Sequence, residues 1–286
     1  MGHSEWSLML FTLLGQMSAG IMLALLVAAL IKPLDGHSPG IRILAGRLAL
    51  ATMVIALLFS FLHLGSPARA VYALSNMAAS WLSREIFFAT AFMVILALWV
   101  VAMELRYKKP ELQLTLHVLA VIAGILMVYS MAMVYVIPTV PVWNSNATIL
   151  AFFTTMLLLG IPSVLVVLMW KEYPLQLQVR MANVSRILLV LAFAGVFLRF
   201  ITTWVVWPAA GIEPGAYDIP QVPFSFQLLQ MGLLVAGTVL LAWWWHRVIS
   251  LKERNISFAA WAWLFFFIAE LKGRYFFYAV YYRLGV

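Results

Sequence analysis

The sequence contains no cysteine, and it is poor in charged residues. Without cysteine, this chain alone cannot hold a disulfide, a thiolate-bound zinc ion or a cysteine-ligated iron–sulfur cluster. Only 10% of its 286 residues are Asp, Glu, Lys or Arg, whereas soluble domains carry about 25%. This scarcity excludes a water-exposed surface around most of the chain, so lipid must replace water there.

Apolar residues make up 65% of the chain, and the mean hydropathy is +1.01. A helix rises about 1.5 Å per residue, so about 20 apolar residues cross the hydrocarbon core of a membrane. Apolar stretches of this length lie at roughly 7–31, 43–64, 84–105, 112–135, 148–170, 184–206, 224–247 and 256–272. The sequence therefore predicts an all-α, polytopic membrane bundle of about eight transmembrane helices that forms a single domain over residues 1–286.

Lysine and arginine are distributed unevenly between alternate loops. The loops after the first, third, fifth and seventh predicted spans hold three each: Lys32, Arg42, Arg47; Arg106, Lys108, Lys109; Lys171, Arg180, Arg186; Arg247, Lys252, Arg254. The opposite interhelical loops hold only Arg69 and Arg84. The positive-inside rule thus places both termini on the non-cytoplasmic side, which in a bacterial inner membrane would be the periplasmic side. The net charge of +8 is accounted for by this topology, so no nucleic-acid partner is expected.

Ionisable residues are expected at the periplasmic ends of several spans. His63 closes the second span, Glu85 opens the third, and Arg199 lies roughly 10 Å inside the sixth. An ionisable group in lipid needs a partner or a functional reason to be there. We expect one cluster, walled by the second, third, sixth and eighth spans and formed by His63, Arg69, Glu85, Arg199, Glu270 and Arg274.

Such a cluster suits the head group of a quinol. An imidazole such as that of His63 can accept a hydroquinone proton near neutral pH. A quinone also needs a hydrogen-bond partner at each carbonyl and an apolar slot for its tail. Two simpler interpretations stay open at this point. His63 can lie at the interface without a ligand, and Arg199 can form a structural salt bridge with Glu85 or Glu270.

Haem is a further alternative, because membrane quinol oxidases often ligate haem between two histidines on facing helices. Only His117 and His246 are suitable, and both fall toward the predicted cytoplasmic ends of their spans. His246 also lies beside Arg247 at a helix end. The sequence therefore favours a chain without haem and without a metal site.

Three stretches give the chain a family resemblance. They are Glu5-Trp6-Ser7-Leu8 in the first span, Ser60-Phe61-Leu62-His63-Leu64-Gly65-Ser66-Pro67 after the second, and Glu270-Leu271-Lys272-Gly273-Arg274 in the last. With them the chain resembles the membrane-anchor subunit of dimethyl sulfoxide reductase, the DmsC family. The resemblance implies an anchor for a molybdopterin catalytic subunit and an iron–sulfur subunit on the periplasmic side.

The resemblance also implies an activity and two site residues. Members of that family oxidise menaquinol without haem and pass the electrons to the iron–sulfur subunit during anaerobic respiration. The family's quinol-site histidine corresponds to His63, and its acidic partner corresponds to Glu85. Arg69 or Arg199 would then hold a carbonyl oxygen or the carboxylate. The terminal electron acceptor is set by a catalytic subunit outside this chain.

Two other functions remain as alternatives. A transporter for a small anionic solute could use Arg199 as its binding residue, but it should show paired helix breaks in two inverted halves. Pro162 in the fifth span has no counterpart in the first. A purely passive anchor without a quinone site is the other alternative.

Overall fold

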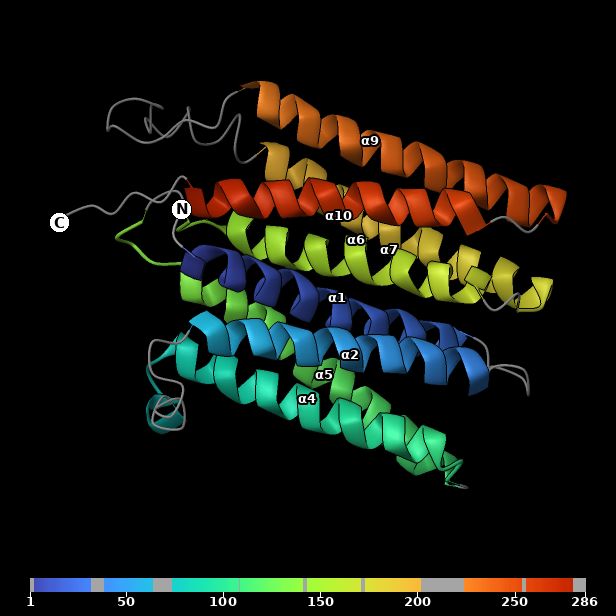
Figure 1. The fold of residues 1–286 in the computed structure, drawn as a ribbon, viewed down its shortest axis with the longest axis horizontal. Helices are drawn as coiled ribbons and strands as arrows, with labels where there is room; N and C mark the ends of the chain where they lie inside the picture. Colours follow the sequence, from blue (N-terminus) through green and yellow to red (C-terminus); the bar gives the residue numbers. More distant parts are fainter. Residues whose placement is uncertain are drawn as a thin grey trace.

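The computed structural model describes residues 3–31, 39–63, 74–107, 109–140, 143–170, 173–201, 224–253 and 256–279. The described part is helical and contains no strand. Its eight α-helices are α1 (His3–Ile31), α2 (Pro39–His63), α4 (Trp81–Glu104), α5 (Pro110–Tyr135), α6 (Asn146–Trp170), α7 (Leu175–Ile201), α9 (Phe224–His246) and α10 (Ile256–Ala279). Two short elements accompany them, η2 (Leu74–Asn76) and η4 (Arg247–Leu251). The α-helices run roughly along one axis (Figure 1).

Seven helices, α1 to α9, are long and apolar enough to cross a membrane. The eighth, α10, has 24 residues but carries Glu270, Lys272 and Arg274 in its second half. The predicted all-α membrane bundle is therefore confirmed. Two boundaries differ clearly: α10 continues to Ala279 and does not end at 272, and α7 begins at Leu175 and not near 184. Its first turns contain polar residues that the apolar pattern does not register, and there the side chain of Gln178 donates to the Tyr173 carbonyl at 2.7 Å.

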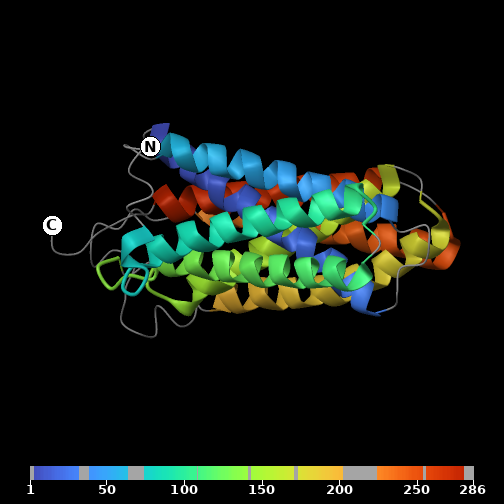
Figure 2. The same cartoon turned by 90° about the horizontal axis from the view of Figure 1, so that it is seen from below.

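The bundle has two groups of helices joined through α1 and α6. In the first group, α4 packs against α5 and α2, and α1 packs against α2 and α5. In the second group, α6 packs against α7 and α10, and α10 packs against α9. Figure 1 shows the two groups one above the other, and Figure 2 shows α2, α4 and α5 of the first group from below.

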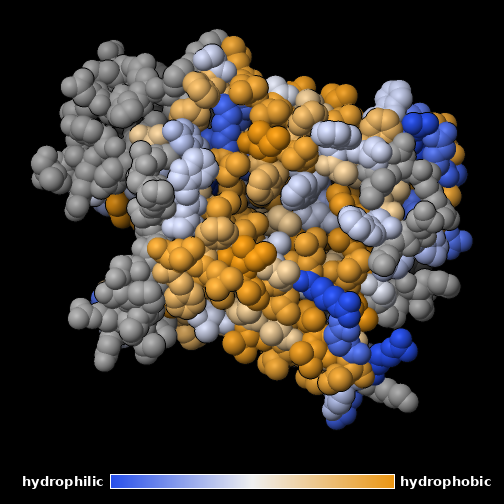
Figure 3. All heavy atoms as spheres, viewed as in Figure 1, coloured by the Kyte–Doolittle hydropathy of each residue, from blue (hydrophilic) through white to orange (hydrophobic). Residues whose placement is uncertain are grey.

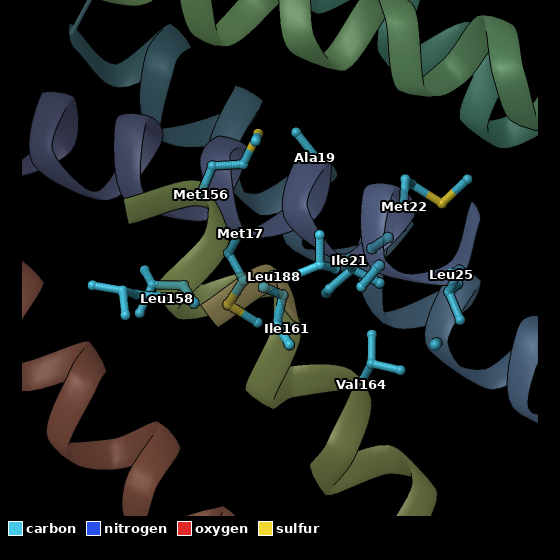
Figure 4. Close-up of a cluster of buried hydrophobic side chains, with 14 of the residues drawn as sticks. Met17, Ala19, Ile21, Met22, Leu25, Met156, Leu158, Ile161, Val164 and Leu188 are labelled. Atoms are coloured by element: carbon cyan, nitrogen blue, oxygen red, sulfur yellow. The ribbon is translucent and has the colours of Figure 1, made fainter. Parts of the chain in front are cut away.

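The backbones of α1 and α6 touch at a pair of glycines. A β-carbon on Gly20 would lie 2.0 Å from the Met156 carbonyl oxygen, and one on Gly160 would lie 2.3 Å from the Gly20 carbonyl carbon. Small residues permit such close approach in membrane bundles, where helix association depends on packing contacts. Met17, Ile21 and Ile161 fill the space around this contact (Figure 4).

The sides of the bundle are apolar, and polar residues gather toward its ends (Figure 3). Leu228, Val235 and Val239 of α9 are exposed, as expected of a helix that faces lipid. The described residues of the basic set, such as Arg42, lie toward the end opposite the one where α1 begins and α10 ends, except Arg186, which lies near the middle of α7. The assignment of that end to the cytoplasm stays a prediction.

Candidate functional site

Buried polar side chains from five helices meet at the end of the bundle where α1 begins and α10 ends. Each is at most 7% exposed. We call this group the terminal polar cluster, and its members are Thr12, Gln16, Glu85, Tyr135, Thr155, Glu270, Arg274 and Tyr278. Because uncompensated polar groups are costly in lipid, their bonds to one another decide what the cluster can do.

Arg274 is the buried cation of the cluster. Its Nη2 donates to Gln16 Oε1 at 3.2 Å, which joins α10 to α1. Its guanidinium carbon lies 3.8 Å from the ring centroid of Phe152 and 5.5 Å from that of Phe277. A guanidinium stacks on aromatic faces and keeps its charge when buried, so these rings provide part of the stabilisation that water would give.

Glu270 lies one turn before Arg274 on the same face of α10. Its Oε2 accepts from the Thr155 hydroxyl at 2.5 Å, and that hydroxyl also lies 2.8 Å from the Ala151 carbonyl oxygen. Its other oxygen, Oε1, has no hydrogen-bond partner among the described residues. Because the Thr155 hydroxyl has a single hydrogen, it can donate to Ala151 while accepting from a protonated Glu270. The Thr155 hydroxyl can therefore serve Glu270 either as a donor or as an acceptor.

Tyr135 and Tyr278 connect the charged members. Their hydroxyl oxygens lie 2.9 Å apart, and the nearby cluster member Thr12 donates its hydroxyl to the Met9 carbonyl at 3.0 Å. Both hydroxyls are close enough to Glu85 and to Arg274 for electrostatic interaction. A carboxyl group on α4 and a cation on α10 therefore both act electrostatically on the tyrosine pair.

The cluster extends inward from the end of the bundle. Tyr135 is the last residue of α5, and Tyr278 is next to last in α10. Thr155 and Glu270 each lie nine residues inside their helices, a depth of about 13 Å by helical rise. The polar groups thus lead from the helix ends into the apolar interior.

Trp143, in the connection between α5 and α6, fixes the end of α10. Its indole nitrogen donates to the Phe277 carbonyl at 2.8 Å, and its ring stacks on Phe277 with centroids 5.1 Å apart. Tyr135 packs edge-on against both rings, at 5.2 Å from each. Aromatic packing of this kind holds the Tyr135 ring where its hydroxyl meets Tyr278.

The structure brings together three of the six predicted site residues, namely Glu85, Glu270 and Arg274. The side chains of His63 and Arg199 lie outside what the structure describes, although their backbones end α2 and belong to the last turn of α7. Arg69 falls in 64–73, which is also outside the described residues. The convergence of His63, Arg69 and Arg199 with the other three residues stays a prediction.

The described walls of the cluster differ from the expected ones. Besides α4 and α10, its members come from α1, α5 and α6, which were not expected because their contributions are uncharged. One signal in the sequence could have found the two members from α1, and Tyr278 on α10. Thr12 and Gln16 are four residues apart, and so are Glu270, Arg274 and Tyr278, which places each set on one helix face.

The two histidines considered for haem lie in different surroundings. His117 is buried, and its Nε2 lies 3.0 Å from the Met22 carbonyl oxygen. His246 ends α9 and is exposed. Among the described residues, no group of three or more His, Asp or Glu side chains is placed to hold a metal ion.

Comparison with known proteins places this arrangement in a family. The model of the DMSO reductase anchor subunit (DmsC) family matches residues 1–280. The sequence is 28% identical to the YnfH chain of anaerobic dimethyl sulfoxide reductase from Escherichia coli (strain K12), over 100% of this protein and 98% of that one. It is 37% identical to the C subunit of anaerobic dimethyl sulfoxide reductase from the same organism, over 56% of each protein. No solved structure matches. The chain therefore belongs to the DMSO reductase anchor subunit (DmsC) family and is a multi-pass inner-membrane protein.

Proposed function

We propose that this chain anchors a molybdoenzyme reductase complex in the inner membrane and oxidises menaquinol at the terminal polar cluster during anaerobic respiration. The observation that supports the proposal is the buried Tyr135–Tyr278 hydroxyl pair, on which both Glu85 and Arg274 act electrostatically at one end of the bundle. A chain of buried hydroxyl and carboxyl groups that opens at a helix end is what proton release from a quinol needs.

His63 is the proposed acceptor of the first hydroquinone proton. It is the last residue of α2, which packs against α4 at the same end as Glu85. Glu85, in the second turn of α4, then carries the proton outward. Arg69 or Arg199 holds a quinone carbonyl oxygen. These roles follow the family resemblance, and the backbone positions of His63 and Glu85 on neighbouring helices support them.

Glu270 and Arg274 complete the proposed site from α10. Arg274, like Glu85 on α4, acts electrostatically on both hydroxyls of the tyrosine pair. Glu270 exchanges the second proton through Thr155. Each turnover converts one hydroquinone to a quinone and releases two protons and two electrons.

The electrons must leave through a partner. The chain has no cysteine, so it cannot supply a cysteine-ligated cluster of its own. An iron–sulfur subunit that docks on the end containing the cluster would take them and pass them to the molybdopterin subunit. We place this end on the periplasmic side, so both protons are released there and turnover does not itself move charge across the membrane.

Replacing His63 with glutamine tests the proposal. A lost general base costs about 10²- to 10⁴-fold in rate, so menaquinol-dependent reduction by the assembled complex should fall by at least about 10²-fold. Reduction driven by an artificial donor to the iron–sulfur subunit should not change. His246→Gln, at an exposed position on the other end, is the matched control. A parental menaquinol rate in His63→Gln would refute the proposed role.

The alternatives predict different observations. A transporter with broken helices is not favoured by α6, which is a continuous helix from Asn146 to Trp170 with Pro162 inside it. A passive anchor would bind no quinol analogue in the assembled complex. Binding of an analogue that His63→Gln or Glu85→Gln weakens therefore separates a quinol-oxidising anchor from a passive one.

A further inference from the structure

A second group of polar side chains, two fully buried and one half-buried, lies toward the opposite end of the bundle, on helices α2, α4 and α5. We call Arg42, Trp99 and His117 the distal trio. The rings of Trp99 and His117 are both 0% exposed, and their centroids lie 4.7 Å apart. The guanidinium carbon of Arg42 lies 5.7 Å from the centroid of the Trp99 ring.

The hydrogen bond of His117 fixes which of its nitrogens can accept. Nε2 lies 3.0 Å from the carbonyl oxygen of Met22 on α1. A carbonyl oxygen only accepts, so Nε2 must carry the hydrogen. In the neutral ring Nδ1 is then a bare acceptor that points away from this bond.

Three buried polar atoms of the trio have no partner within the described part of the chain. They are the Nδ1 acceptor of His117, the Nε1–H donor of Trp99 and the Nε–H donor of Arg42. Buried polar groups in proteins are nearly always hydrogen-bonded, to protein atoms or to a bound molecule. An acceptor and a donor in adjacent rings point to a ligand that can both donate and accept.

The Trp99 ring of α4 packs closely against the backbone of α2 at the distal trio. A β-carbon on Gly46 would lie 2.6 Å from the Cζ3 atom of Trp99. The absence of a side chain at Gly46, one turn after Arg42, therefore lets the Trp99 ring approach the backbone of α2. The ring therefore packs against both the backbone of α2 and the ring of His117.

We propose that the distal trio binds a hydroxyl group, which donates its hydrogen to His117 Nδ1 and accepts from Trp99 Nε1–H. A carbonyl or an anion would leave His117 unsatisfied, because it only accepts. A cation would face the charge of Arg42 and the Trp99 N–H. Two sources supply the same chemistry, an ordered water molecule and the hydroxyl of a quinol head group.

Solid-state NMR of the full chain in phosphatidylcholine vesicles tests this site. Histidine is labelled with ¹⁵N, and His117→Gln identifies the His117 signals among the five histidines. We expect a protonated Nε2 and a non-protonated Nδ1, and magnetisation transfer from water protons to Nδ1 in vesicles without quinone. Transfer that arises only after menaquinol is added assigns the hydroxyl to the quinol.

The donor is tested with Trp99→Phe, which keeps an aromatic ring but removes the N–H. The transfer to His117 Nδ1 should fall severalfold, because the hydroxyl loses the bond that holds it. Trp244→Phe is the matched control, since Trp244 is also 0% exposed but belongs to α9. Thermal unfolding of both variants establishes that they fold. A protonated Nδ1, or no transfer to Nδ1 with or without menaquinol, would overturn the proposal.

Discussion

The hydroxyl oxygens of Tyr135 and Tyr278 lie 2.9 Å apart in the interior of the protein, although 143 residues separate the two tyrosines in the chain. This bond joins the end of α5 to the end of α10 and thereby links the two groups of helices. Since both hydroxyls also interact with Glu85 and Arg274, a defect in this bond should affect both stability and the proposed proton release.

Removing either hydroxyl should therefore slow menaquinol oxidation. Tyr135→Phe and Tyr278→Phe each leave the other hydroxyl with one partner fewer in a buried place, at a cost of about 1–3 kcal/mol. The expected result is a lower kcat with an unchanged rate from an artificial donor, together with a lower unfolding temperature. Tyr129→Phe on the same helix α5 serves as control, because Tyr129 is only partly buried and packs edge-on against Trp81. If Tyr129→Phe lowered kcat and the unfolding temperature as much, the Tyr135–Tyr278 bond would have no specific role in menaquinol oxidation.

Glu85→Gln should lower turnover while keeping the size of the side chain. The amide cannot accept and release a proton, so kcat should fall by roughly 10²-fold, as for other lost acid–base groups. Steady-state kinetics with menaquinol measure this change. Glu104→Gln is the control, because Glu104 belongs to the same helix but forms an exposed pair with Arg47 at the other end. A parental rate in Glu85→Gln would exclude Glu85 from the path.

Arg274→Lys should destabilise the bundle even though the charge is kept. A lysine ammonium cannot stack its plane on Phe152 and reach Gln16 at the same time. We expect a loss of about 1–3 kcal/mol in the free energy of unfolding, the range for a broken bond to a buried charged group. Arg47→Lys, at a side chain that is 58% exposed, should cost less than about 1 kcal/mol. Thermal unfolding in detergent compares the two variants.

Gly160→Ala should disrupt the contact between α1 and α6. Its β-carbon would overlap the backbone of Gly20, which cannot move without shifting a whole helix. Overpacking of this kind typically costs about 1–3 kcal/mol, and we expect the upper end of that range together with a poor yield of monodisperse protein. Gly232→Ala on α9 is the matched control, because a β-carbon there meets nothing within 4 Å. A normal unfolding temperature for Gly160→Ala would contradict the described contact.

Much of this fold could be predicted from the sequence because lipid imposes a simple rule. An apolar run of about 20 residues becomes a spanning helix, and the described helices begin and end close to the predicted runs except at the end of α10 and the start of α7. There the polar first turns of the helix hide its start from a hydropathy pattern. Which helices touch could not be predicted, because the Gly20–Gly160 contact depends on shape and not on hydropathy.

The charged residues of the site were predictable, and the neutral ones were not. Glu85, Glu270 and Arg274 stand out in an apolar chain, because each needs a reason to be buried. Thr12, Gln16 and Thr155 are uncharged, and a hydropathy pattern gives them no such signal. Their part in the cluster became visible only when α1 and α6 were placed beside α10.

The bond from Gln16 to Arg274 also has a consequence for biosynthesis. These partners are 258 residues apart, so at roughly 5–20 residues per second the ribosome needs tens of seconds to deliver the second after the first. During that interval the amide of the first helix stays in the bilayer without its final neighbour. The first helix can therefore form its final contact only after the last helix has been synthesised. Premature termination would leave an inserted but incomplete bundle that quality-control proteases can recognise.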